Sequence, residues 1–78
     1  MDDKSVLAHI HDLVTEEKRL RTKNHGLSAE DRRRLEKVEI ELDQYWDLLR
    51  QRRARTEFGE DPDTARERSA NEVEGYLQ

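Results

Sequence analysis

Apolar residues recur every three or four positions in two segments of the chain, and the segments meet at a single break. The first stripe is Val6, Ile10, Leu13 and Leu20, interrupted by Glu17, and the second is Leu35, Val38, Leu42, Tyr45 and Leu49. This spacing places the apolar residues of each segment on one face of an α-helix. Residues 24–28, Asn-His-Gly-Leu-Ser, contain a glycine that is typical of a helix C-terminus, followed by a serine that is typical of a helix N-cap. Because a short connection makes neighbouring helices antiparallel, the pattern predicts an all-α fold based on a two-helix hairpin.

Capping signals give the expected limits of the two helices. The first is expected over about residues 4–23, with Asp2 or Asp3 as its cap and Gly26 in the left-handed conformation that ends a helix. The second is expected over about residues 29–58, which contain no Gly or Pro. Ser28 is its predicted cap, in a sequence that resembles a capping box. Roughly 30 residues at ~1.5 Å each give a rod about 45 Å long.

The remaining residues, 59–78, form an acidic tail that follows the hairpin of residues 1–58. Gly59 ends the second helix, and Pro62 suits the first position of a short new one. Ser69-Ala70-Asn71-Glu72 is a further capping box, and three apolar residues follow it on roughly one helical face: Val73, Tyr76 and Leu77. The sequence therefore predicts possible short helices here and weak docking of the tail.

The second helix has more apolar surface than one partner helix covers. Four large residues at its middle, which together cover more than about a third of the helix circumference, are Tyr45, Trp46, Leu48 and Leu49. Without a further partner they would leave an exposed apolar patch. We expect them to form an interface that joins two hairpins into a four-helix bundle with coiled-coil packing, as a homodimer. The alternative is a partly folded monomer that awaits a different protein.

Composition narrows the class of protein. The chain has 78 residues, of which 44% are charged, and no cysteine, so a disulfide framework and thiolate chemistry are excluded. No apolar run reaches the length of a membrane span, so we expect a cytoplasmic protein without a membrane partner. The net charge of −4 lies entirely in the tail, which carries six acidic and two basic residues. This balance argues against a dedicated nucleic-acid-binding protein, which is usually basic.

The densest basic run lies near the end of the second helix, beyond the expected start of the first: Arg50, Arg52, Arg53 and Arg55. These residues can complement the negative end of the helix dipole. They can pair with acidic residues of the tail or of another copy, or they can contact phosphate. Trp46 lies just before them, and Trp and Arg are typical of protein-binding hot spots. We expect the tail to shield the run electrostatically.

The other candidate sites have ordinary explanations. His9 and His11 point to different helix faces, so they lack the spacing of a helical metal pair, and His25 stands alone. Acidic residues at the middle of the second helix lie off the seam, as a solvated face would: Glu36, Glu39, Glu41, Asp43 and Asp47. No nucleophile with an adjacent base is visible. The sequence predicts no enzyme activity, no metal or other cofactor, and no small-molecule substrate.

Two polar residues interrupt the first stripe at seam positions, Glu17 and Asn24. Polar residues in a helical seam can specify its register or oligomeric state. The alternative is simple exposure at the seam edge, where Glu17 can meet an arginine such as Arg33 or Arg34. The pattern leaves both open.

The central segment resembles the signature of a family of short actinobacterial proteins that is classed as a domain of unknown function. The matching residues are Glu41-Leu42-Asp43-Gln44-Tyr45-Trp46-Asp47-Leu48-Leu49-Arg50-Gln51-Arg52-Arg53-Ala54. Ile10-His11, Glu17-Lys18-Arg19-Leu20, the Gly59–Pro62 turn and Val73-Glu74-Gly75-Tyr76 also fit its pattern. The resemblance implies a small bacterial protein and transfers no activity, ligand or catalytic residue.

These observations favour a non-enzymatic protein-interaction or scaffold module whose expected partner is itself, with another protein as the alternative partner. The competing hypothesis is a regulator that contacts nucleic acid or its machinery through residues 50–55. The two differ in salt dependence, because phosphate binding weakens steeply with salt and an apolar interface does not.

Overall fold

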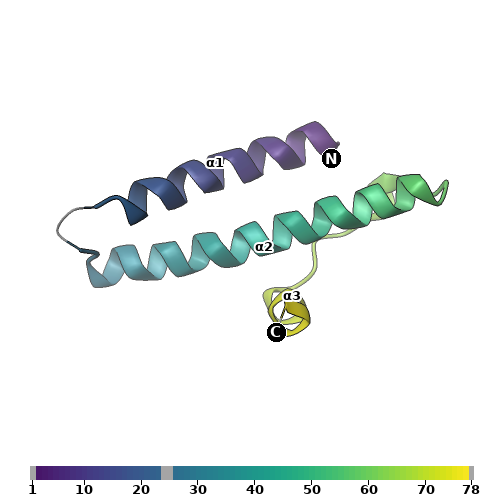
Figure 1. Cartoon of the computed structure of the whole chain (residues 1–78). Helices are drawn as coiled ribbons and strands as arrows, with labels where there is room; N and C mark the ends of the chain where they lie inside the picture. The colour runs from purple at the N-terminus through teal and green to yellow at the C-terminus, as the bar shows by residue number, and fades with distance from the viewer. Residues whose placement is uncertain (1, 24–25, 78) are drawn as a thin grey trace.

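Two long helices lie side by side and antiparallel in the computed structural model, which describes residues 2–23 and 26–77 (Figure 1). Helix α1 spans Asp3–Arg21 and α2 spans Ala29–Glu57. A 3-10 turn, η1, follows at Pro62–Thr64, and α3 spans Ala70–Leu77. Within the described ranges the chain is helical or irregular, with no strand, which confirms the all-α prediction. The expectations for Asn24 and His25, and for the side chains of Tyr76 and Leu77, fall outside what is described.

Local capping explains where the long helices begin and end. Asp2 caps α1 by accepting a hydrogen bond from the Ser5 backbone N–H at 2.8 Å. Ser28 caps α2 in the same way, accepting from the Asp31 N–H at 3.1 Å. Gly26 and Gly59 adopt positive φ angles of 76° and 74°, a conformation that residues with a Cβ rarely adopt. Gly59 directly follows Phe58, the cap of α2, whereas α1 ends at Arg21 with Thr22 as its cap, so Gly26 lies beyond the helix end that it was predicted to form. Both turns thus depend on glycine.

The core lies along the seam between α1 and α2. It consists of residues from both predicted stripes and one leucine outside them: Val6, Ile10, Leu13, Val38, Leu42, Leu48 and Leu49. Val14, Tyr45 and Ala65 pack against this cluster. Ala65 belongs to the tail, so the core is formed by three segments of the chain.

The tail folds back along α2 and covers the side opposite α1. Figure 1 shows α3 across α2, with the hairpin partner α1 on the other side. Val73 anchors α3 with only 1% of its surface exposed, and Leu48 is buried as well. The expectation that Leu48 and Leu49 would form an interface with a second hairpin is therefore wrong, because both are buried in the core of one chain; the burial of Leu49 agrees with its place in the predicted seam.

Helix α1 also reaches further along α2 than the sequence indicated. The sequence placed the basic run of residues 50–55 beyond the start of the first helix, but Asp3 at the start of α1 contacts Arg52. Only the last turn of α2 extends beyond this contact, and Phe58, the cap residue that follows α2, is 80% exposed.

Candidate protein-interaction surface

Two large apolar side chains stay exposed on one edge of the hairpin. Trp46 of α2 is 43% exposed and Leu7 of α1 is 41% exposed. Leu7 lies two heptads before Arg21, and Trp46 lies one heptad after Glu39, so each pair shares one edge of its helix. Arg21 donates a hydrogen bond to Glu39, which brings these two edges together. We call this edge, with Leu7 and Trp46 at its centre, the Trp46 surface.

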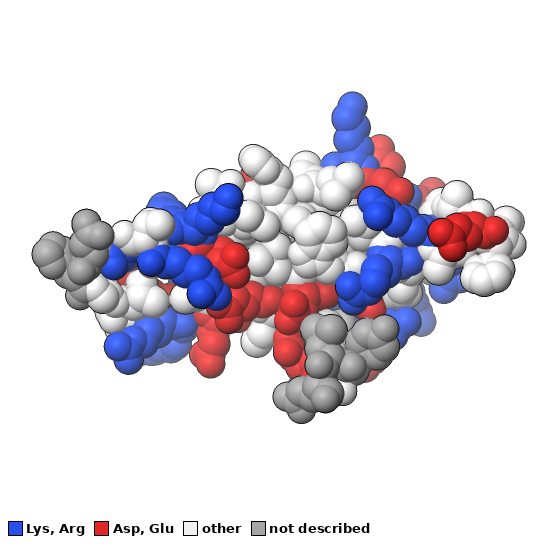
Figure 2. All heavy atoms as spheres, in the orientation of Figure 1, with Lys and Arg blue, Asp and Glu red and all other residues white. Residues whose placement is uncertain are grey.

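Charge surrounds the Trp46 surface. Figure 2 shows uncharged side chains over the middle of the hairpin, with Lys and Arg groups towards both ends and acidic side chains along the border with α3. An uncharged centre with a charged rim is the usual anatomy of a protein-binding surface.

The other predicted interface residues have partners within the chain. Tyr45 lies on the opposite edge from Trp46 and stacks on His9, with ring centroids 5.1 Å apart and 9° between the planes. Burial raises the pKa of the Tyr45 phenol, and the nearby charges of Glu67 and Glu41 add to this effect. Leu48 and Leu49 belong to the core. Of the four residues, Trp46 is the one left largely exposed.

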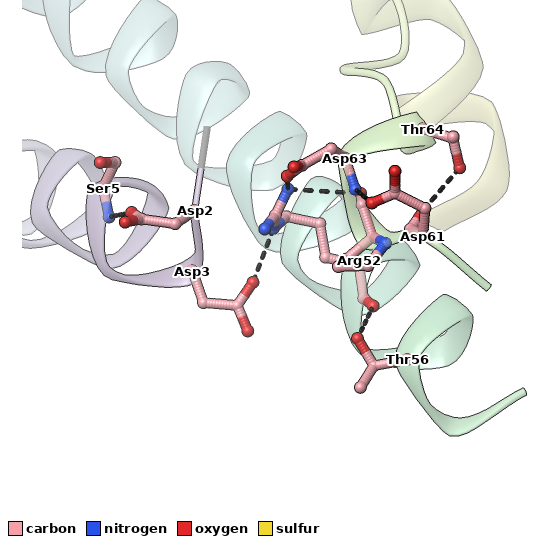
Figure 3. A network of polar contacts seen from close by, with 9 residues as sticks. Asp2, Asp3, Ser5, Arg52, Thr56, Asp61, Asp63 and Thr64 are labelled. Atoms are coloured by element: carbon pink, nitrogen blue, oxygen red, sulfur yellow. Dashed lines mark hydrogen bonds and ion pairs between the residues drawn. The ribbon is translucent and has the colours of Figure 1, made fainter. Parts of the chain in front are cut away.

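Arg52 is an internal residue, although it belongs to the predicted basic run. It is 5% exposed. Its Nε donates to Asp3 Oδ1 at 2.6 Å, and its Nη1 donates to Asp63 Oδ1 at 3.0 Å and to the Pro62 carbonyl at 3.3 Å. Hydrogen bonds to Asp3 and Asp63 raise the pKa of the guanidinium. Figure 3 shows it between the start of α1 and η1, so it is not available to phosphate.

The other three arginines of the basic run differ in their surroundings, since one is paired with the tail and two are exposed. Arg55 pairs with Glu60 of the tail at 3.1 Å. Arg50 and Arg53 are exposed, and neither forms an ion pair or side-chain hydrogen bond with another described residue. The acidic tail therefore neutralises part of the run, through Asp63 and Glu60, and leaves two arginines beside Trp46.

A row of polar residues on α2 holds the tail, and the sequence interpretation missed its role. Gln44 donates to the Arg68 carbonyl at 3.2 Å, and Gln51 donates to the Arg66 carbonyl at 2.8 Å. Asp47, between them, is 4% exposed, accepts from Gln51 at 2.9 Å and lies 3.4 Å from Arg68 Nε. The sequence contained one sign of this contact, since Gln44, Asp47 and Gln51 are spaced by three and four residues and so lie on one face of the helix. The tail partners of Gln44 and Gln51 are backbone carbonyls, which no side-chain pattern reveals.

Two carboxyl groups meet where α3 crosses α2. A hydrogen bond with Asp43 raises the pKa of Glu74, and burial raises it further. Glu74 Oε1 is buried and has no hydrogen-bond partner among the described residues. Asp43 is thus part of a contact with α3, and Asp47 is buried beside Arg68 of the tail, whereas the sequence placed both on a solvated face.

Ion pairs join the helices near the turn. Arg34 contacts Glu16 through both carboxylate oxygens, at 2.5 and 2.8 Å, which holds the pKa of that carboxyl below its usual value. Lys23 lies 2.6 Å from Asp31 and lowers its pKa in the same way. Glu17 is half-buried and lies 3.7 Å from Arg21 on its own helix, so it does not meet Arg34 as one alternative supposed.

Within residues 2–23 and 26–77 no three His, Asp or Glu side chains gather as a metal site would require. None of the helices in these ranges combines the length and apolar character needed to cross a bilayer. Three open hollows of about 240, 380 and 220 Å³ lie between the second half of α2 and the tail, and each borders Gln51 and Arg68.

Comparison with known proteins gives the family. A family model described as "Protein of unknown function (DUF2630)" matches residues 2–78. The chain belongs to the DUF2630 family. It is 54% identical over 77 residues to an uncharacterised protein of Mycobacterium bovis, a match that covers 95% of this chain and 88% of the relative. Uncharacterised proteins from two Mycobacterium tuberculosis strains match equally well. No solved structure matches.

Proposed function

We propose that this DUF2630 protein is a non-enzymatic protein-interaction module and that the Trp46 surface is its contact site. The observation that carries the proposal is the exposure of the chain's single tryptophan, 43%, at the middle of α2. Leu48 and Leu49, which follow it closely in sequence, are buried within the chain, and Trp46 is not.

The exposed indole of Trp46 lowers the stability of the single chain and can stabilise a complex. A small domain gains stability from each large side chain that it buries, and an exposed indole forgoes that gain. The same indole contributes strongly when a partner covers it, since Trp and Arg dominate binding hot spots. Arg50 and Arg53 are exposed on the same helix, within two turns of Trp46. Together the three residues give this face of α2 the combination of Trp and Arg that is typical of protein-binding hot spots.

Nucleic-acid binding through residues 50–55 has weaker support. Arg52 is buried in an ion-pair network, and Arg55 is paired with Glu60. Two exposed arginines remain, on a chain with a net charge of −4. A site that contacts phosphates usually gathers more cations and less surrounding acid.

Site-specific photo-crosslinking in living cells tests the proposal. A photoreactive amino acid is placed at position 46 in one variant and at Arg33, an exposed position elsewhere on α2, in a matched control. In a mycobacterial host we expect position 46 to yield a discrete protein adduct, to the same protein or to another, and the control to yield none. An equal pattern at both positions, or no adduct at position 46, would contradict the proposal.

A further inference from the structure

The charges along the Trp46 edge of α2 are arranged in a way that identifies the kind of partner. Five residues follow one another at steps of four and three, as in a heptad seam: Glu39, Asp43, Trp46, Arg50 and Arg53. The acidic residues all precede Trp46 and the basic residues all follow it. We call these five residues the α2 strip.

Such a strip is complementary to itself when two copies run antiparallel. A two-fold axis at Trp46 places residues after it opposite residues at an equal distance, to within one position, before it on the partner. Arg50 then faces Asp43 of the other copy, and Arg53 faces Glu39. A parallel pairing would place like charges together, which is unfavourable. Glu36 and Glu57, the next residues on this edge, have the same charge, so complementarity extends only over residues 39–53.

We propose that the partner of the Trp46 surface is a second copy of this chain, bound through antiparallel pairing of the two α2 strips. The two Trp46 side chains meet at the axis, and Leu7 of each copy extends the apolar centre. The result is a four-helix bundle made of two hairpins. This inference rests on the proposed function, because it names the occupant of the same contact surface.

The contacts within one chain leave the required charges available. Arg50 and Arg53 have no ion-pair partner among the described residues. Asp43 lies against the Glu74 carboxyl, and Glu74 Oε1 is buried without a hydrogen bond in the described part of the chain. A cation from the second copy beside Asp43 would offset the cost of holding two carboxyl groups together. Glu39 already contacts Arg21, and its carboxylate has further lone pairs to accept Arg53.

Charge reversal in complementary variants tests the pairing. Arg50→Glu with Arg53→Glu makes the strip acidic throughout, and Glu39→Lys with Asp43→Lys makes it basic throughout. We expect the wild-type chain to be a dimer and each variant alone to dissociate, with the dissociation constant raised roughly 100-fold or more because each attraction becomes a repulsion in both symmetric copies. The two variants mixed should form a one-to-one heterodimer.

The control is Arg19→Glu with Arg33→Glu, which changes the net charge equally at exposed positions outside the strip. It should remain a dimer, and circular dichroism should show the same helix content in all variants. The acidic variant removes no described ion pair, so it tests the pairing even if the basic variant folds poorly. A monomeric wild-type chain, or an acidic variant that dimerises like the control, would overturn the inference. If position 46 still crosslinks to a different protein in cells, the proposed function stands and only the self-pairing falls.

Discussion

Arg52 Nε, in the second half of α2, lies 2.6 Å from Asp3 Oδ1 in the first turn of α1. The same guanidinium donates to Asp63 Oδ1 in η1 at 3.0 Å. One buried cation thus joins the start of the hairpin to its long helix and to the returning tail (Figure 3). It explains why α1 and the tail reach the same part of α2 from different sides.

Replacing Arg52 with Met should destabilise the fold by about 2 kcal/mol, since several charge-assisted hydrogen bonds are lost while Asp3 and Asp63 remain solvated. The matched control is Arg53→Met, at an exposed neighbouring position. Urea denaturation followed by circular dichroism measures both. Equal midpoints for the two variants would show that the Arg52 network contributes nothing to stability.

The hairpin should lose stability in acid. Hydrogen bonds from Arg34 and Lys23 lower the pKa values of Glu16 and Asp31 from their ordinary values of 4.5 and 3.8. A carboxyl with a lower pKa in the folded state stabilises the fold fully above its unfolded-state pKa. This contribution disappears as the pH falls through the folded-state pKa. Urea denaturation between pH 6 and about pH 3 should show the decline, and Glu16→Gln should make it shallower. A Glu16→Gln profile parallel to that of the wild type would argue against this cause.

The docking of α3 should respond to pH in the opposite direction. The pKa of Glu74 is raised above its ordinary value of 4.5 by its hydrogen bond with Asp43. A carboxyl with a raised folded-state pKa stabilises docking fully below the unfolded-state pKa, and the contribution is lost as the pH rises through the folded-state value. Amide hydrogen exchange at Val73, corrected for the intrinsic pH dependence, should therefore show tighter docking in mild acid.

The variant Glu74→Gln isolates this effect, because an amide cannot ionise. It should remove the pH dependence and dock α3 at neutral pH as firmly as the wild type docks it in acid. Glu72→Gln, at an exposed position of α3, should keep the wild-type profile. An unchanged profile for Glu74→Gln would mean that another group governs the response.

The hairpin could be predicted because its signals are local and repeated. Ser28 and Gly26 mark the turn, and the stripes led to the seam residues that the structure buries. The return of the tail could not be predicted in the same way, since it depends on Gln44 and Gln51 meeting backbone carbonyls far along the chain. The sequence pattern placed Arg52 on the surface, because its partners Asp3 and Asp63 belong to other segments of the chain. For the candidate site, the sequence identified Trp46, but it could not tell which of its neighbours the tail and α1 would cover.

The hydrogen bonds from Gln51 should decide how firmly the tail is held. Gln51→Ala removes the bonds to the Arg66 carbonyl and to the buried Asp47, and should weaken tail docking by about 1 kcal/mol. Trypsin should then cleave after Arg66 and Arg68 several-fold faster than in the wild type, because the segment opens more often. Glu57→Ala, at an exposed position of α2, should leave the cleavage rate unchanged. A similar rate in both variants would contradict the assigned role of Gln51.

Sedimentation equilibrium combined with Trp46 emission shows whether a second copy covers Trp46. Across micromolar concentrations we expect about twice the chain mass, with blue-shifted emission that moves to the red as dilution separates the copies. Because Trp46 is the only tryptophan, the emission reports on this site alone. A single-chain mass at every concentration, with emission typical of a water-exposed indole throughout, would show that no second copy covers Trp46.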